Sequence, residues 1–332
     1  METESRIKNP RARASSVRGR QELRIRMPAI AILGPTSSGK SDLAIWLARK
    51  FNGEIVSVDS RQVYRGMDLG TGKVTKMEQQ LASHHMIDIV VPGKTYTVAQ
   101  FKKRADKEIE KIFKRGHIPI LVGGSHLYMR ALLYNYTIPK VKPDAKYRKL
   151  LESKTTKRLL SLLKKVDEPY YDIVDQQNRR RLIRALEVYH ASGKKFSSLT
   201  GSQSSKYDVL KIGIHSDRTA LYKKIDERVD ARVRKGMIRE VQRLRESGVS
   251  QKWLKGIGLE YRFISEYLTI IQKLKVQSLK LKVRNEMLQL LKYATHDFAR
   301  RQLTWYRREN DITYVTSYTA AQNIVKRFLA SL

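Results

Sequence analysis

The residues from Gly34 to Ser41 have the types and spacing of a phosphate-binding loop. They read G-P-T-S-S-G-K-S and match the pattern G-x-x-x-x-G-K-[ST] at every position. In such a loop, backbone N–H groups and the N-terminus of the next helix surround phosphate oxygens, and the lysine adds a full charge. The motif predicts a diphosphate-bearing ligand, but it does not decide whether that ligand is ATP. The predicted ligand-binding residues are Gly34, Pro35, Thr36, Ser37, Ser38, Gly39, Lys40 and Ser41, with the Ser41 hydroxyl available to Mg²⁺.

A carboxylate follows the next predicted strand, which should lie beside this loop. Asp59 comes directly after the apolar run 54–58, and residue types alone also allow a metal ligand or a helix cap there. Gln62 could bond to a nucleobase edge or serve a structural purpose. The His84–His85 pair suggests packing rather than a metal site, because the chain has no cysteine and only Asp88 lies nearby.

A frame of alternating strands and helices must position these residues. Short apolar runs typical of buried parallel strands occur at 28–33, 54–58, 118–122, 211–215 and 312–315. Helical spacing follows the loop over 41–51, and Thr97 with Gln100 forms a capping box that opens a helix to Lys114. This order predicts the α/β class, a P-loop NTPase-like core with a parallel sheet.

The rest of the chain divides by composition. Residues 137–205 are basic and helical without a strand pattern, which predicts an all-helical insertion domain between core segments 27–136 and 206–332. Residues 1–26 form a basic tail that we expect to be disordered. On the last long helix, a predicted core stripe comprises Val283, Met287, Leu290, Leu291, Ala294 and Phe298.

Charge and composition narrow the class of partner. The 332 residues contain 67 Lys and Arg against 32 Asp and Glu, a net charge of +35 that favours a polyanion such as RNA. The absence of cysteine excludes disulfides, thiolate metal sites and cysteine nucleophiles. No apolar stretch is long enough for a membrane span, so we expect a cytoplasmic protein.

Five ordered sequence blocks resemble those of bacterial (MiaA-type) tRNA dimethylallyltransferases, also called tRNA isopentenyltransferases. The likeness covers about residues 29 to 316. Three positions depart from the family pattern: Ser125 replaces a threonine, Leu259 an aromatic residue and Lys224 an arginine. The blocks are Gly53–Lys73 around D-S-R-Q-V-Y-R-G-M-D-L-G-T-G-K, His84–Ile89, Leu121–Tyr128, Arg180–Tyr189 and Arg301–Trp305.

The resemblance implies transfer of a dimethylallyl group from dimethylallyl diphosphate to the N6 amine of adenosine at tRNA position 37. The product would be N6-(dimethylallyl)adenosine, and the loop would hold the diphosphate leaving group rather than ATP. By this likeness Asp59 is the general base and Thr36 orients the substrates. Lys40, Arg218 and Mg²⁺ on Ser41 would neutralise the departing diphosphate.

The resemblance also implies a monomer that binds the anticodon stem-loop of tRNA. The target adenosine must leave its stack to reach the diphosphate. The residues expected to contact tRNA are Asp59, Ser60, Arg61, Gln62, Ser125, Arg180, Arg181, Leu182, Ile183, Arg184, Arg301 and Gln302.

Three other functions compete with this interpretation. A P-loop kinase for a small metabolite would use the loop, but it would not need the basic surface. An isopentenyltransferase for free adenine nucleotides would not need the basic helices either. A non-catalytic RNA-binding protein is disfavoured because Lys40, Ser41 and Asp59 are all intact.

Overall fold

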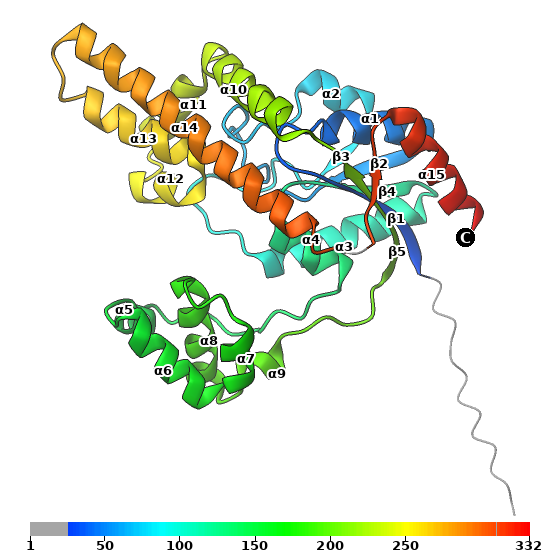
Figure 1. Ribbon diagram of the computed structural model, residues 1–332, viewed down its shortest axis with the longest axis horizontal. Helices are drawn as coiled ribbons and strands as arrows, with labels where there is room; N and C mark the ends of the chain where they lie inside the picture. Colours follow the sequence, from blue (N-terminus) through cyan, green and yellow to red (C-terminus); the bar gives the residue numbers. More distant parts are fainter. Residues whose placement is uncertain (1–25, 310) are drawn as a thin grey trace, which may run out of the picture.

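A six-stranded parallel sheet forms the centre of the computed structural model, which describes residues 26–309 and 311–332 (Figure 1). Its strand order is β3-β2-β4-β1-β5-β6. The predicted α/β class with a parallel sheet is confirmed. The predicted tail, residues 1–26, falls almost wholly outside the described residues. The strands are β1 (Met27–Leu33), β2 (Gly53–Ser57), β3 (His84–His85), β4 (Ile118–Val122), β5 (Tyr207–Ile214) and β6 (Thr313–Val315).

Apolar helices cover both faces of the sheet. One face packs against α1 and α15, whose residues Leu47 and Val325 are fully buried among strand isoleucines. The other face packs against α3 and α4, where Phe101 and Met129 are buried. The predicted capping box at Thr97 and Gln100 opens α3. The helices that cover the sheet are α1 (Lys40–Lys50), α3 (Val98–Lys114), α4 (His126–Leu133) and α15 (Tyr318–Ala330), and the short α2 (Lys76–Leu81), which has no buried residue, contacts α1.

The five helices that follow α4 and precede β5 form a separate body with its own core (Figure 1). Both linkers to this insertion meet at an antiparallel bridge, where the Thr137 amide donates to the Gly201 carbonyl at 2.8 Å. Leu182 and Ile183 are buried inside the insertion, so they are core residues and the expectation that they contact RNA is corrected. The helices are α5 (Ala145–Glu152), α6 (Thr156–Val166), α7 (Glu168–Ile173), α8 (Arg179–Ser192) and α9 (Phe196–Leu199).

A helical arm follows β5 and packs against the loop after β2. Its longest helix, α14, runs antiparallel beside α13 and ends against the core (Figure 1). The predicted core stripe of α14 is only partly right, because Leu290 is exposed and Phe298 faces a cavity. The buried residues of α14 are Met287, Leu291, Thr295, Ala299, Gln302 and Tyr306. The arm comprises α10 (Arg218–Arg234), α11 (Met237–Glu246), α12 (Gln251–Ile257), α13 (Leu259–Ile271) and α14 (Gln277–Tyr306).

Two buried charges hold the loop after β2 in place. The Glu240 carboxylate of α11 accepts hydrogen bonds from the backbone N–H groups of residues 68–70 and from the Tyr261 hydroxyl. The Lys73 ammonium contacts Asp68 at 2.6 Å and Asp88 at 2.5 Å. Each charge is satisfied by several partners, which offsets the cost of burying it. The loop that carries the Asp59 block is therefore fixed to the arm.

Gly123 lets two strand ends approach closely at the edge of the sheet. A methyl group added at its Cα would lie 2.0 Å from the Val58 carbonyl oxygen, one residue before Asp59. Because the obstacle is backbone, rotation of a side chain cannot relieve the clash. The position of Asp59 therefore depends on a glycine in the neighbouring strand's loop.

We expect Gly123→Ala to destabilise the protein by about 1–3 kcal/mol, the usual cost of overpacking. Gly256→Ala is the matched control, because a methyl group at this α12 position meets nothing within 4 Å. Helix propensity should make that control neutral or about 1 kcal/mol more stable. Urea unfolding of both variants measures the difference, and equal stability would show that the Val58–Gly123 contact carries no constraint.

Candidate active site

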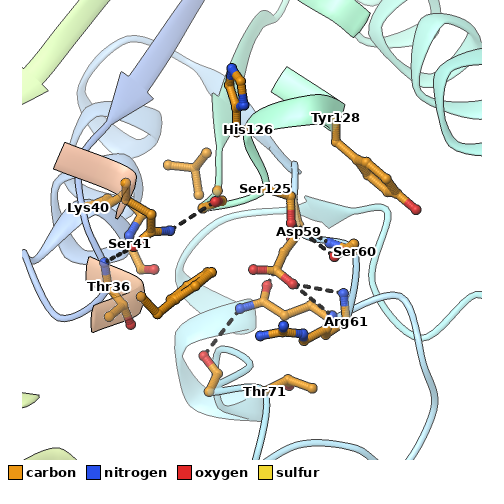
Figure 2. Close-up of a pocket in the computed structure, with 18 of the residues that line it drawn as sticks. Thr36, Lys40, Ser41, Asp59, Ser60, Arg61, Thr71, Ser125, His126 and Tyr128 are labelled. Carbon is orange, nitrogen blue, oxygen red and sulfur yellow. Dashed lines mark hydrogen bonds between the residues drawn. The ribbon is translucent and has the colours of Figure 1, made fainter. Parts of the chain in front are cut away.

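A cavity of about 640 Å³ opens at the carboxyl ends of β1, β2 and β4. Thr36, Lys40 and Ser41 of the phosphate loop lie on one side, and Asp59 lies on the other (Figure 2). Ser125 and His126 border it from the start of α4. This edge of a parallel sheet is where ligands of such folds commonly bind.

The phosphate loop has the backbone geometry that its sequence predicts. Ser37 and Gly39 take positive φ angles of 62° and 88°, which curl the chain before α1 begins at Lys40. The Lys40 ammonium donates to the Pro35 carbonyl at 2.8 Å and so closes over the loop. The N-terminus of α1 adds the positive end of its dipole to the same space.

Gln302 joins the phosphate loop to two other segments. Its side-chain oxygen accepts from the Thr36 backbone N–H at 2.9 Å, and its side-chain nitrogen donates to the Gly124 carbonyl at 2.9 Å. The residue is only 6% exposed. Gln302 therefore fixes the end of α14 against the loop. Although this residue was expected to contact RNA, both the oxygen and the nitrogen of its side-chain amide bond to protein.

Two arginines of α10 border the cavity beside the phosphate loop. The Arg228 guanidinium lies 3.5 Å from the Ser37 hydroxyl and 3.4 Å from the Gly72 carbonyl oxygen. Arg232, one helical turn further, also lines the cavity. Burial and then the like charge of Arg232 lower the pKa of Arg228 to about 10. Burial and then the charge of Arg228 lower the pKa of Lys40 to about 8, although Asp59 opposes this shift. The cluster favours a multiply charged anion.

Asp59 is oriented by its own loop. One carboxylate oxygen, Oδ1, accepts from the backbone N–H groups of Arg61 at 2.8 Å and Gln62 at 3.3 Å (Figure 2). These bonds form a turn that leaves Oδ2 free of protein hydrogen bonds among the described residues. The geometry agrees with a base that is held in place and still has one oxygen for a substrate proton.

Polar side chains complete the wall on the Asp59 side. The Gln62 side-chain oxygen accepts from the Ser57 hydroxyl at 2.8 Å, and its nitrogen donates to the Gly72 carbonyl at 3.2 Å. The Ser125 hydroxyl oxygen accepts from the Ser60 backbone N–H at 2.9 Å. Gln62, Ser60 and Ser125, which the sequence analysis expects to contact tRNA, all border the cavity.

The insertion and α14 supply the remaining walls. Asp175, Asn178 and Arg181 of the insertion border the cavity opposite the arm. The guanidinium groups of Arg61, from the loop after β2, and Arg301, from α14, lie over the Phe298 ring of α14 at 5.6 and 5.9 Å from its centroid. Cationic and aromatic groups therefore line the same opening.

The His126 ring lies 4.0 Å from the Trp305 ring, centroid to centroid, beside this opening. Burial, followed by the charges of Arg130 and Arg181, lowers the pKa of His126 to about 4. The imidazole is therefore neutral at physiological pH. It presents an uncharged aromatic surface to the cavity.

Some predicted site residues lie away from this cavity. The Arg218 guanidinium contacts the Tyr222 ring at 5.3 Å, and Arg218 does not border the cavity. Arg184 pairs with the buried carboxylate of Glu187 at 2.7 Å and donates to the Val141 carbonyl, so its contacts are structural. Arg180 is exposed on the insertion. Of the three arginines in that block, only Arg181 reaches the cavity.

Sequence reasoning missed Arg228, Arg232 and Phe298. The two arginines are four residues apart on one helix, so they share a face, and this spacing was the available signal. Among residues 26–309 and 311–332, no three His, Cys, Asp or Glu residues gather as a metal site. The Ser41 hydroxyl still fits Mg²⁺, because this ion commonly takes one or two protein ligands and binds phosphate oxygens and water. No helix in the described part is long and apolar enough to cross a membrane.

A parallel sheet with a phosphate loop at the carboxyl ends of its strands and a helical insertion defines a P-loop NTPase-like fold. In this protein the Asp59 carboxylate faces the phosphate loop across the cavity. The family model for IPP transferase matches residues 62–309. The chain belongs to this family.

Known relatives agree along almost the whole chain. A tRNA dimethylallyltransferase of Thermomicrobium roseum is 41% identical over 293 residues, 87% of this chain and 86% of the relative. The structure is similar to a tRNA isopentenylpyrophosphate transferase from Bacillus halodurans, with a TM-score of 0.65, 32% identity and coverage of 92% and 96%. It is also similar to a eukaryotic dimethylallyltransferase acting on tRNA, with a TM-score of 0.75, 28% identity and coverage of 92% and 80%.

The lowered pKa of Lys40 predicts pH-dependent binding of an alkyl diphosphate. Below pH 8 the ammonium is already charged, so affinity should be flat. Above pH 8 the free protein loses this proton and binding must take it up, so the dissociation constant should rise by about tenfold per pH unit. The ligand's own second phosphate pKa, about 6, lies outside this range.

Isothermal titration calorimetry of dimethylallyl diphosphate between pH 6.5 and 9.5 measures this dependence. Lys40→Met should bind weakly without the pH slope. Lys40→Arg should also lack the slope, because a guanidinium stays charged throughout. A slope that persists in Lys40→Met would assign the titrating group elsewhere.

Proposed function

We propose that this protein transfers the dimethylallyl group of dimethylallyl diphosphate to N6 of adenosine 37 in tRNA. One observation carries the proposal: the phosphate loop and a positioned carboxylate face each other across one cavity that also opens to the basic insertion. The family relationship supports the same reaction. The protein would act where tRNA is present, in the cytoplasm, and as a monomer.

The diphosphate end of the donor binds at the phosphate loop. Backbone N–H groups of the loop, Lys40 and Arg228 surround its oxygens, and Thr36 orients it from the start of the loop. When bound at Ser41 beside the diphosphate, Mg²⁺ would supply further neutralising charge. As the allylic C–O bond breaks, negative charge grows on the diphosphate, so these cations stabilise the transition state more than the ground state.

The acceptor enters from the opposite side and meets Asp59. The N6 lone pair attacks C1 of the dimethylallyl group while the C1–O bond breaks, and its electron pair leaves with the diphosphate. The free oxygen of Asp59 accepts one N6 proton, which leaves a neutral secondary amine on the base. Gln62, Ser60 and Ser125 surround Asp59 and can hold the adenine edge in line with C1.

Binding of tRNA involves the insertion and the arm. Arg180 and Arg181 are exposed on α8, and Arg181 borders the cavity, so they suit phosphates of the anticodon stem-loop. Arg61 and Arg301 suit nucleotides at the cavity mouth. Arg184 stabilises the insertion through Glu187 rather than touching RNA.

The direct test is incubation of the full chain with dimethylallyl diphosphate, Mg²⁺ and unmodified tRNA. Mass spectrometry of the nucleosides should show N6-(dimethylallyl)adenosine without any ATP. Phosphorylation of an acceptor by ATP, with no prenyl transfer, would favour the kinase alternative. Modification of free adenine nucleotides but not of tRNA would favour the alternative isopentenyltransferase.

We expect Asp59→Ala to lower the single-turnover rate by roughly two to four orders of magnitude, the usual contribution of a general base. Affinity for tRNA should change little, since Asp59 is one contact among many. Rapid-quench single-turnover assays and filter binding measure the two quantities. A near-normal rate would place the base at another residue.

Variants of Arg228 and Arg218 test which of these two arginines binds the diphosphate. Arg228→Ala should weaken binding of dimethylallyl diphosphate and slow transfer together, because its guanidinium borders the phosphate loop. Arg218→Ala should have a smaller effect on both, since its guanidinium lies against Tyr222 outside the cavity. Calorimetry and single-turnover rates decide between them. The reverse ranking would support the sequence-based role of Arg218.

A further inference from the structure

A largely apolar row of side chains on α14, which also contains Arg301, continues from the cavity onto the protein surface. Residues 290, 294, 298, 301 and 305 are spaced by three or four positions, so they follow one side of the helix. Phe298, Arg301 and Trp305 border the cavity. Leu290, at the outer end of this row, is 54% exposed, and the neighbouring Tyr293 is 58% exposed.

This row is distinct from the core side of α14. Met287 and Leu291 are buried against α13, and the row begins one position away at Leu290. Two large apolar side chains therefore remain in solvent near a reactive cavity. Single exposed apolar residues are ordinary, but a row continuous with a site usually marks a binding surface.

The groups along the row suit nucleobases. Tyrosine rings, leucine side chains and guanidinium planes all offer surfaces on which bases stack, and Arg61 and Arg301 already flank Phe298 in this way. The carboxylate of Asp297 also lies on this side, but it pairs with Arg300 at 3.0 Å. Glu286 is exposed one turn before Leu290 and bounds the row at its far end.

We propose that the outer part of this row, Leu290, Ala294 and Phe298, binds together with the neighbouring Tyr293 the unpaired anticodon-loop nucleotides next to the target adenosine. Eight residues of α14 separate Leu290 from Phe298, a rise of about 12 Å, which matches about three stacked bases. Bases held here compensate for the stacking lost when the adenosine leaves its loop. The proposal rests on the proposed function, since it specifies how the same RNA is held.

The test compares the double variant Leu290→Ala/Tyr293→Ala with Leu281→Ala. Leu281 lies on the same helix and is also 54% exposed. It precedes Leu290 by nine residues, which places it on the opposite side of the helix. Circular dichroism and thermal melting check that each variant is folded, and Tyr293→Phe keeps the stacking ring.

The dissociation constant of full-length protein for unmodified tRNA should rise about 5- to 100-fold in the double variant, the usual effect of removing a base-stacking partner. It should stay within about twofold in Leu281→Ala and Tyr293→Phe. The slope of log affinity against log salt should not change, because no phosphate contact is lost. Transfer at saturating tRNA should fall less than affinity.

A modified tRNA tests whether the row contacts the bases next to the target adenosine. A tRNA with abasic sites at the nucleotides flanking the target should bind wild-type protein as weakly as the double variant binds intact tRNA. The double variant should then be insensitive to the abasic sites, since the two changes remove the same contact.

Equal tRNA affinity of the double variant and Leu281→Ala would overturn the inference. If the abasic sites weaken tRNA binding by the double variant as much as they weaken binding by the wild type, the inference is also overturned. A dimer found by sedimentation in wild type, but not in the double variant, would assign the row to a second copy. Wild-type protein that neither binds nor prenylates tRNA would instead refute the proposed function.

Discussion

The main physical constraint in this structure is the burial of three positively charged side chains close to one another. Lys40, Arg228 and Arg232 crowd one end of the cavity, and burial prevents water from screening them. Desolvation of the three groups and the repulsion of Arg228 by Lys40 and Arg232, which the Glu260 carboxylate 3.7 Å from Arg232 offsets only in part, are a cost that the fold carries before any ligand arrives. A multiply charged anion reverses it, so the strained cluster becomes a strong phosphate site. Elements that place these cations, above all α1 and α10, are the ones on which function depends.

The remaining architecture keeps the phosphate loop and Asp59 at a fixed separation. Gln302 fixes the end of α14 to the phosphate loop, and Glu240 fixes the loop after β2 to the arm. Gly123 permits the close approach that sets Asp59 at the sheet edge. Each contact is buried and polar or sterically tight, so it tolerates few alternatives. Preorganisation of this kind lowers the cost of bringing donor and acceptor into line.

Local patterns predicted what local chemistry determines. The phosphate loop, the parallel-sheet class and the α3 capping box could be predicted because a few adjacent residues determine each of them. Arg228 could not be predicted, since its role depends on which face of α10 turns toward Ser37 of a loop 191 positions away in the chain. Leu290 was assigned to the core because periodicity locates a stripe only to within one position. Tertiary packing decides which neighbouring row is covered.

The bridge between Thr137 and Gly201 has a consequence for the history of the chain. Both ends of the insertion meet at a short hydrogen-bonded junction, formed by the Thr137–Gly201 bridge and by the Gln203 N–H group, which donates to the Tyr134 carbonyl, while the insertion has its own apolar core. The strands of the sheet pair with one another without any contribution from the helices of the insertion. Such a junction lets a lineage exchange, lengthen or lose the helical insertion by changes at two adjacent points, leaving the sheet and its cavity intact.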